Sequence, residues 1–330
     1  MLRLTPPGYL RFFQNDTLET AFGGGEANVA VSLAGFGVDA AFVTKLPDND
    51  IGTAAIAELR KYGVDVSFIA RGGERMGIYF LEKGASQRPS KVIYDRKYSS
   101  VSEAVVSDFN FDAIFNGAEF FHFTGITPAL SDAAAELTLI AVKKAKGKGL
   151  TVSCDLNYRK SLWTTKKANE IMRTLMPFVD ILIANEEDAE KIFGIGAESS
   201  ESDRGRISRE GYTGVAKKLI TEFGFKKVGI TLRESISASD NIWSAMICNG
   251  GECYFSRKYP IHIVDRIGGG DAFASGLIYG ILAGMSDSDM VEFAAAASCL
   301  KHSIEGDFNR VSVAEVNNLL SCGGSGRVQR

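Results

Sequence analysis

The 330-residue sequence predicts an α/β protein: a doubly wound, mostly parallel sheet with flanking helices and a small β lid. Three observations predict this fold. Helical and strand-like segments alternate from about residue 21, the later strands are short and continuously apolar, and one predicted hairpin interrupts the alternation. Continuous apolar runs are typical of parallel strands that are buried on both faces. We therefore expect a single domain over residues 1–330.

The first helices and strands are indicated by their periodicity and by glycine. The segment 26–37, EANVAVSLAGFG, has helical spacing and ends in glycine, and the segment 51–63, IGTAAIAELRKYG, repeats that pattern. Between them, DAAFVTKL at 39–46 is strand-like. Four later apolar runs, each followed by a polar or helical stretch, predict buried parallel strands: AEFFHFTGI, GLTVSCDLN, VDILIAN and KKVGITL.

Other segments depart from this alternation. Residues 75–101 contain two strand-like runs around a Gly/Pro/Ser turn, which predicts a hairpin that forms a lid together with about residues 1–20. Residues 197–211 are polar and predict a surface loop, and residues 321–330 predict a flexible tail. Ahead of its prolines, MLRLTPPG supplies barely half a strand, so the expectation is that the sequence either begins inside an element or lacks one.

Composition limits the classes of function. The formal net charge of −3 provides no basic field for nucleic acid or for an anionic membrane, so a small-molecule ligand held by local geometry is expected. No apolar run reaches the roughly 20 residues that span a bilayer, and the first residues lack a secretory signal. The cysteines number five, with no CxxC pair, which argues against a disulfide framework or a structural zinc site and favours the cytoplasm.

The most informative stretch is VDRIGGGDAFASGLIYGIL, residues 264–282, in which three glycines and an aspartate precede an apolar helix. Gly268, Gly269 and Gly270 let the backbone approach a phosphate, and the helix N-terminus points N–H groups at anions. Asp271 would then be a catalytic base for phosphoryl transfer. The alternative is that Asp271 only caps the helix after a loose glycine turn, because aspartate is a preferred N-cap.

Two further segments offer ligand-binding groups. In AFGGGEANVA, Asn28 and the backbone at Gly24 are suited to bind sugar hydroxyls, although this segment alone favours a glycine turn with Glu26 in the first helical turn. In KVIYDRKY, Tyr94 and Arg96 lie on one face by the two-residue period, as Tyr79 does on the paired strand, which suits a sugar acid. A half-exposed strand with a polar outer face is the alternative.

Two strand ends supply the remaining candidates. In CDLNYRKSLW, Arg159 follows a strand and is suited to clamp a carboxylate or a phosphate, or else it pairs locally on the surface. In IANEEDAEKIFG, Asn185 and nearby carboxylates are suited to arrange Mg²⁺ through water, or the acidic residues only favour the helix dipole.

In this order, GGGEAN, NEED and DRIGGGD resemble the motifs of the ribokinase-like (phosphofructokinase B) family of sugar kinases over almost the whole chain. The family signature DTxGAGD corresponds to residues 265–271. The resemblance implies that Asp271 is the catalytic base and that the amides of Gly268, Gly269 and Gly270 form the anion hole, with ATP and Mg²⁺ as cofactors and K⁺ as a further candidate.

Within the family, the segments LRLTPPG, GIYFLEKG, YDRKYS and NYRKSLW are most similar to the 2-keto-3-deoxygluconate kinase branch. The resemblance therefore implies phosphorylation of 2-keto-3-deoxygluconate to its 6-phosphate in a cytoplasmic homodimer or higher homo-oligomer. There are two alternatives. One is a kinase for a neutral sugar such as fructose or ribose, and the other is a non-catalytic regulator that binds a sugar or a nucleotide. The implied substrate-binding residues are Gly24, Asn28, Tyr79, Tyr94, Arg96, Arg159, Asp271 and Asp307.

The resemblance also implies a nucleotide side and cation positions. The implied ATP-binding residues are Asn185, Thr231, Arg233, Gly268 and Gly270. Asp188 would position Mg²⁺ through water, and Asp265 would hold a monovalent cation. Two positions depart from the family pattern: Arg266 stands where the signature has threonine, and Asp188 stands where NxxE has glutamate.

Overall fold

The computed structural model describes residues 1–185, 187–197 and 208–323. Most of the predicted surface loop at 197–211 and of the predicted tail at 321–330 lies outside these residues. The last described helix, α11 (Val313–Cys322), includes the first two residues of that predicted tail.

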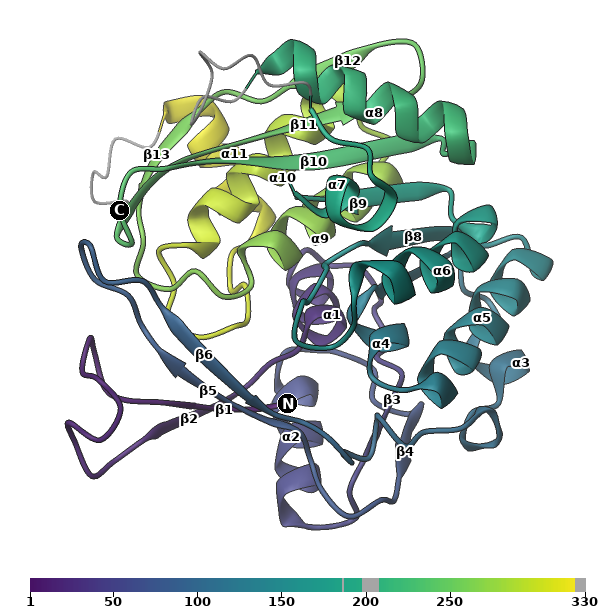
Figure 1. The fold of residues 1–330 in the computed structure, drawn as a ribbon, viewed down its shortest axis with the longest axis vertical. Helices are drawn as coiled ribbons and strands as arrows, with labels where there is room; N and C mark the ends of the chain where they lie inside the picture. The colour runs from purple at the N-terminus through teal and green to yellow at the C-terminus, as the bar shows by residue number, and fades with distance from the viewer. Residues whose placement is uncertain (186, 198–207, 324–330) are drawn as a thin grey trace.

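The central sheet has seven strands, and its order places the predicted strands side by side (Figure 1). Strands β7, β8, β9 and β10 are parallel neighbours, and β11 continues the sheet antiparallel to β10 and pairs with both β12 and β13. The bounds are β7 (Phe120–Thr124), β8 (Thr151–Asp155), β9 (Ile181–Ala184), β10 (Lys227–Ser235), β11 (Asp240–Cys248), β12 (Cys253–Phe255) and β13 (Tyr259–His262).

Helices cover both faces of this sheet, as the continuous apolar strands predicted. In β9, Leu182 and Ala184 join the core on one face, whereas Ile181 and Ile183 join the core on the other. The first core is covered by α5 (Asp132–Gly147), α6 (Thr165–Leu175) and α8 (Arg209–Phe223). The second is covered by α1 (Gly25–Gly35), α9 (Gly269–Leu282), α10 (Asp287–Lys301) and α11. The fold is therefore the doubly wound α/β architecture that the sequence predicts.

Shorter elements complete the two layers. They are α2 (Asp50–Lys61), α3 (Phe111–Ile114), α4 (Ile126–Ala129), α7 (Asp188–Phe193) and the 3₁₀ turns at Val106–Asp108 and Met176–Phe178. Among the described residues, no helix is long and apolar enough to cross a membrane.

The lid is a separate four-stranded sheet of order β2-β1-β5-β6 that crosses below the central domain in Figure 1. It is built from β1 (Leu2–Thr5), β2 (Glu19–Phe22), β5 (Ile78–Glu82) and β6 (Lys91–Asp95). The hairpin β5–β6 and the N-terminal strands therefore form one sheet, as expected from residues 1–20 and 75–101. The hairpin tip contacts the turn after β10, where the Ala238 amide donates to the Ser86 carbonyl over 2.8 Å.

A cavity separates the central sheet from the small parallel sheet of β3 (Thr44–Leu46) and β4 (Ile69–Arg71). Residues 38–46 line one side of it and residues 117–123 the other. Within the described part of the chain, β7 pairs only with β8, and no strand lies between β7 and β3.

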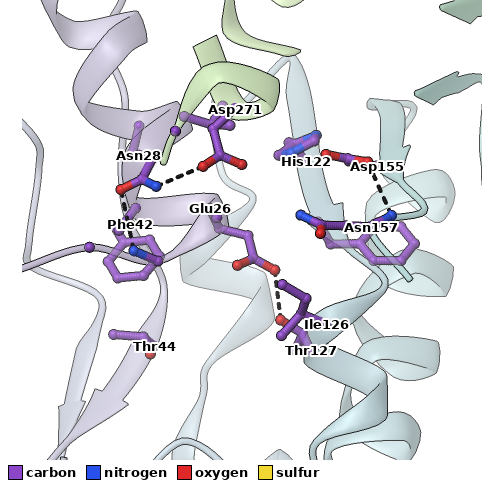
Figure 2. A pocket seen from close by; sticks show the side chains of 18 of the residues that line it. Glu26, Asn28, Phe42, Thr44, His122, Ile126, Thr127, Asp155, Asn157 and Asp271 are labelled. Carbon is purple, nitrogen blue, oxygen red and sulfur yellow. Dashed lines mark hydrogen bonds between the residues drawn. The ribbon is translucent and has the colours of Figure 1, made fainter. Parts of the chain in front are cut away.

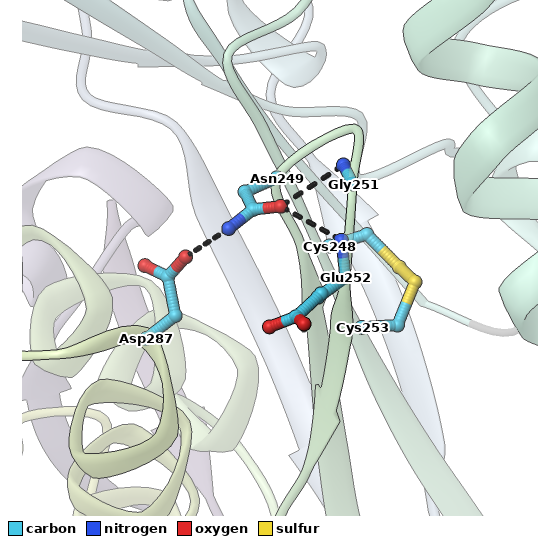
Figure 3. Close-up of a disulfide and its surroundings, with 6 residues drawn as sticks. All are labelled: Cys248, Asn249, Gly251, Glu252, Cys253 and Asp287. Carbon is cyan, nitrogen blue, oxygen red and sulfur yellow. Dashed lines mark hydrogen bonds between the residues drawn. A yellow bond between two sulfur atoms is a disulfide. The ribbon is translucent and has the colours of Figure 1, made fainter.

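The sequence argued against disulfide bonding of the cysteines, and this expectation is wrong for one pair. A disulfide joins Cys248 at the end of β11 to Cys253 at the start of β12 (Figure 3). These two residues are directly opposed in the antiparallel register, which brings their Cβ atoms within reach of each other. Asn249 orders the turn between them by accepting from the amides of Gly251 and Glu252 and by donating to Asp287 over 2.7 Å. A four-residue turn, rather than CxxC spacing, made this pairing hard to predict.

Candidate active site

The cavity beside β3 and β4 continues to the space between the lid and the carboxyl ends of the parallel strands, and its whole volume is about 870 Å³. Ligands of open α/β sheets bind at this edge because the polar loops and the helix N-termini that follow the strands converge there. Residues from the lid, α1, the strand ends and the start of α9 all line it. Every predicted sugar- and ATP-binding residue lines the same pocket: Gly24, Asn28, Tyr79, Tyr94, Arg96, Arg159, Asn185, Thr231, Arg233, Gly268, Gly269, Gly270, Asp271 and Asp307.

The glycine loop opens α9 as the sequence predicted. Gly268 is the N-cap and has φ +83°, a left-handed conformation that favours glycine. A Cβ on Gly268 would lie 2.1 Å from the Asp307 carbonyl oxygen, so this position excludes any side chain. The following amides belong to the first turn of a helix, where N–H groups have no intrahelical acceptor. Gly269 and Gly270 line the pocket, which is compatible with the predicted phosphate-binding role, and the Gly269 amide donates to the Arg266 carbonyl over 3.5 Å.

Asp271 lies in this first turn and is held by a residue of α1. The Asn28 side-chain amide donates to the Asp271 carboxylate over 2.7 Å, and the Asn28 oxygen accepts from the Gly24 amide over 3.2 Å (Figure 2). Burial raises the pKa of Asp271 to about 6, while the hydrogen bond from Asn28 opposes this shift. A carboxylate with this pKa is charged at neutral pH and is a stronger base than an ordinary aspartate, which suits a catalytic base.

The shifted pKa predicts the pH dependence of catalysis. Because the base must be deprotonated, kcat/KM is expected to fall about tenfold per pH unit below about pH 6. Steady-state rates across pH 4.5 to 8, with a coupling system verified at each pH, give this profile. A flat profile through pH 5 would show that Asp271 does not act as the base.

Replacing Gly268 tests the loop geometry. Gly268→Ala is expected to lower kcat by about 100-fold or more, because the left-handed φ and the contact with the Asp307 carbonyl force the loop amides to move. The matched control is Gly214→Ala in α8, where a new Cβ meets no atom within 4 Å and activity should be retained. Equal activity of the two variants would contradict the assigned role of the loop.

The side of the pocket that is predicted to bind the sugar contains two guanidinium groups with open hydrogen-bonding positions. Arg96 is buried and its guanidinium lies over the Tyr94 ring, 4.0 Å from the centroid. The Nη2 of Arg96 and the Nε of Arg159 are buried nitrogens without a hydrogen-bond partner. Burial lowers the pKa of Arg96, and the nearby charge of Arg159 lowers it further. Two adjacent like charges with unused donors favour an anionic ligand.

Asp307 and Tyr79 are joined to each other at the edge of this side. The Tyr79 hydroxyl donates to Asp307 over 2.6 Å, and Arg3 donates to the same carboxylate oxygen over 3.0 Å. The other carboxylate oxygen lies against Gly23, where a Cβ would come within 1.9 Å of it. Asp307 therefore supports the wall of the pocket through lid contacts that the sequence did not predict.

On the side that is predicted to bind the nucleotide, the carboxyl groups of Asp155 and Asp188 lie near the ends of β8 and β9. Asp188 accepts from the amides of Tyr158 and Asn185 over 3.2 and 3.3 Å, and Asn185 accepts from the Asp188 amide over 3.0 Å. Burial raises the pKa of Asp155, and the charge of Asp188 raises it further. Within the described chain, no cluster of three or more His, Cys, Asp and Glu side chains forms a metal site. Glu186 lies outside the described residues.

Sequence reasoning missed the role of Glu26, which it placed only in a helical first turn. Its carboxylate accepts from the amide and hydroxyl of Thr124. It also accepts from the hydroxyl of Thr127 (Figure 2). These bonds fix the start of α1 to the end of β7. The signal was present in GGGEAN, but its partners are about 100 residues away in sequence, so local patterns do not identify them.

Comparison with known proteins identifies the family that shares this site. A model described as the pfkB family carbohydrate kinase matches residues 11–309. The chain belongs to the pfkB family. Like other members, this pfkB protein is a carbohydrate kinase, so the sequence-based resemblance is confirmed.

Similar proteins act on related sugar acids. The crystal structure of a 2-dehydro-3-deoxygluconokinase from Thermotoga maritima is 54% identical, with a TM-score of 0.94 over 97% of this pfkB chain and 95% of that one. A 2-dehydro-3-deoxygalactonokinase from Haloferax volcanii is 32% identical over 99% of this chain and 96% of its own. A 2-dehydro-3-deoxygluconokinase from Bacillus subtilis is 29% identical over 91% and 86%.

Proposed function

We propose that this kinase transfers the γ-phosphoryl group of ATP to the 6-hydroxyl of 2-keto-3-deoxygluconate, which is the compound also called 2-dehydro-3-deoxygluconate. The unused donors of Arg96 and Arg159 carry this proposal, because a carboxylate satisfies both the charge and the hydrogen bonds. A neutral sugar would leave the buried Arg96 guanidinium beside Arg159 without a carboxylate to pair with. The names of the similar proteins support the same substrate class.

The reaction follows from the arrangement around Asp271. Its carboxylate accepts the proton of the 6-hydroxyl, and the resulting oxygen attacks the γ-phosphorus in line with the bond to the β-phosphate. That bond breaks and ADP leaves. The amides of Gly268, Gly269 and Gly270 meet the charge on the transferred group at the N-terminus of α9. Arg96 and Arg159 orient the acid so that its far end faces Asp271.

Asp155 and Asp188 fit a hydrated Mg²⁺ that enters with ATP. They are neighbouring buried carboxyl groups that accept from backbone amides, and a nearby cation would favour their charged forms, which burial disfavours. Mg²⁺ keeps several of its waters, which suits carboxylates that act from a distance. When bound, the ion neutralises phosphate charge. Asn185, Thr231 and Arg233 complete this side as the proposed ATP contacts.

The lid supports the same function by excluding water. Its hairpin tip is hydrogen-bonded to the turn after β10, and Arg96 reaches from the lid into the pocket. Water would otherwise compete with the sugar as phosphoryl acceptor. The lid also exposes apolar side chains on its outer face, of which Phe13 is 99% and Ile93 45% exposed. We propose that two copies pair through these surfaces, and that the enzyme works in the cytoplasm, where ATP is available.

Identification of the product tests the proposal. With 2-keto-3-deoxygluconate and ATP, we expect ³¹P NMR to show a new phosphomonoester whose coupling to the C6 protons places it on C6. The same reaction with fructose is expected to give little product. If fructose were phosphorylated and the acid were not, the proposed substrate would be wrong. If ATP bound and no carbohydrate were phosphorylated, the regulator alternative would be favoured.

A further inference from the structure

Behind the glycine loop lies a buried group of four charged residues, here called the charge cluster: Arg3, Asp265, Lys301 and Asp307. The Arg3 guanidinium donates to Asp265 over 2.6 Å and to Asp307 over 3.0 Å. All four residues are at most 3% exposed. The cluster joins the lid strand β1 to the two segments that carry Gly268 and Asp307.

Lys301 is the last residue of α10 and its side chain lies directly under the N-cap of α9. Its Cε is 3.2 Å from the position that a Cβ on Gly268 would take, and its ammonium donates to the Ile304 carbonyl over 3.1 Å. Burial lowers the pKa of Lys301, while the charges of Asp265 and Asp307 raise it. Lys301 does not line the pocket, so its ammonium acts from behind the loop without touching a ligand.

The charge cluster does not fit the monovalent cation that the sequence placed at Asp265. One oxygen of Asp265 accepts from the Ile267 amide over 3.0 Å, and the other accepts from Arg3 and from the Gly306 amide over 3.1 Å. The Arg3 guanidinium pairs with both carboxylates, and the Lys301 ammonium, which donates to the Ile304 carbonyl, adds a second positive charge close to them. The adjacent Glu305 is half exposed and is paired with Lys83 over 2.6 Å.

Arg266, which departs from the family signature, is directed elsewhere. Its guanidinium donates to the Ala238 carbonyl in the turn after β10 over 3.0 Å. Arg266 therefore helps to hold the turn that the lid contacts. Its charge also acts on Asp265, but Arg3 is the residue that donates to Asp265, and Lys301 lies under the loop. A desolvated K⁺ would need oxygen ligands and negative charge that these two residues already use.

We propose that the Lys301 ammonium, held by the Ile304 carbonyl within the charge cluster, replaces a bound monovalent cation: it positions the Gly268 loop and places a positive charge behind the loop amides. Phosphoryl transfer accordingly needs no K⁺. The inference rests on carbohydrate kinase activity and is independent of which sugar acid is the substrate. Lys301 is thus a positioning residue that acts through the loop.

The wild-type enzyme gives the first test. Its kcat is measured in tetramethylammonium buffer, because that ion is too large for a buried site, and again after addition of potassium, sodium or ammonium chloride at matched ionic strength. We expect kcat to change less than about twofold, and the melting temperature to stay constant, since an ion that bound the folded state would raise it. A tenfold or larger activation by potassium would overturn the proposal.

Substitution of Lys301 gives the second test. Lys301→Met keeps the volume of the side chain and removes the charge, so kcat should fall about 10- to 100-fold while KM for the sugar changes little. Lys301→Ala leaves space under the loop, and ammonium or potassium ions are expected to restore part of its rate. The control is Lys217→Met on the exposed face of α8, which should behave as wild type.

These two tests give results that do not depend on which carbohydrate is the substrate. All rates are measured with whichever carbohydrate the enzyme phosphorylates, so a different sugar leaves every ratio intact. A folded Lys301→Met enzyme with the wild-type kcat would overturn the positioning role. If the variants do not fold, the cation dependence of the wild-type rate still decides whether the cluster replaces K⁺.

Discussion

Asp271→Asn is expected to lower kcat by about 10²- to 10⁴-fold, because the amide is no longer able to accept the hydroxyl proton. The fold should be retained, since asparagine has almost the same shape and Asn28 still finds an oxygen acceptor at 2.7 Å. Steady-state rates in a coupled ADP assay measure the change. KM for ATP should remain close to wild type, because the loop amides are unchanged.

The stability of this variant provides an independent readout. The folded pKa of Asp271, about 6, is above the unfolded value of about 3.9, so the folded state binds the extra proton between these limits. The Asp271 contribution to stability is therefore full below about pH 4 and is lost as pH rises through about 6. Asp271→Asn should remove this slope from the pH dependence of unfolding. An unchanged kcat would exclude Asp271 from the mechanism.

Arg96→Ala is expected to lower kcat/KM for the sugar acid about 10- to 100-fold, since a charge-assisted hydrogen bond contributes about 1.5 to 3 kcal/mol. The loss should appear mainly in KM. For a neutral sugar the same change should have little effect, because Arg96 has no carboxylate to bind there. Kinetics with the acid and with fructose, measured on wild type and variant, give the comparison.

Arg75→Ala is the matched control, because Arg75 also belongs to the hairpin segment but pairs with Asp95 at the surface over 2.7 Å. This variant should leave the preference for the acid unchanged. Equal losses for acid and neutral sugar in Arg96→Ala would show that Arg96 only supports the lid, for example through its stacking on Tyr94.

The sequence was sufficient for features that depend on local pattern. The apolar runs predicted β7 to β10, and the Gly/Pro/Ser turn predicted the β5–β6 hairpin, because buried parallel strands and tight turns have their own compositions. Residues 264–282 predicted a glycine loop that opens a helix, and Gly268 has the left-handed φ that this requires. The order of the motifs predicted the family.

Contacts between distant segments were not predictable in this way. Arg3 contacts Asp265 across 262 residues, and Glu26 contacts Thr124 across 98. Neither pair has a local signature, because each depends on how the lid and α1 pack on the central domain. The antiparallel extension from β11 to β13 was also missed, and with it the Cys248–Cys253 disulfide, since pairing across a sheet depends on register.

The central claim is that two guanidinium groups select a sugar acid, which is then phosphorylated with Asp271 as the base. Competition between a sugar acid and a neutral sugar tests this claim most directly. Equimolar 2-keto-3-deoxygluconate and fructose are incubated with enzyme and limiting ATP, and the two phosphorylated products are quantified by mass spectrometry. Their ratio equals the ratio of kcat/KM values. We predict an excess of the acid phosphate of about 10-fold or more. Equal products, or an excess of fructose phosphate, would contradict the account.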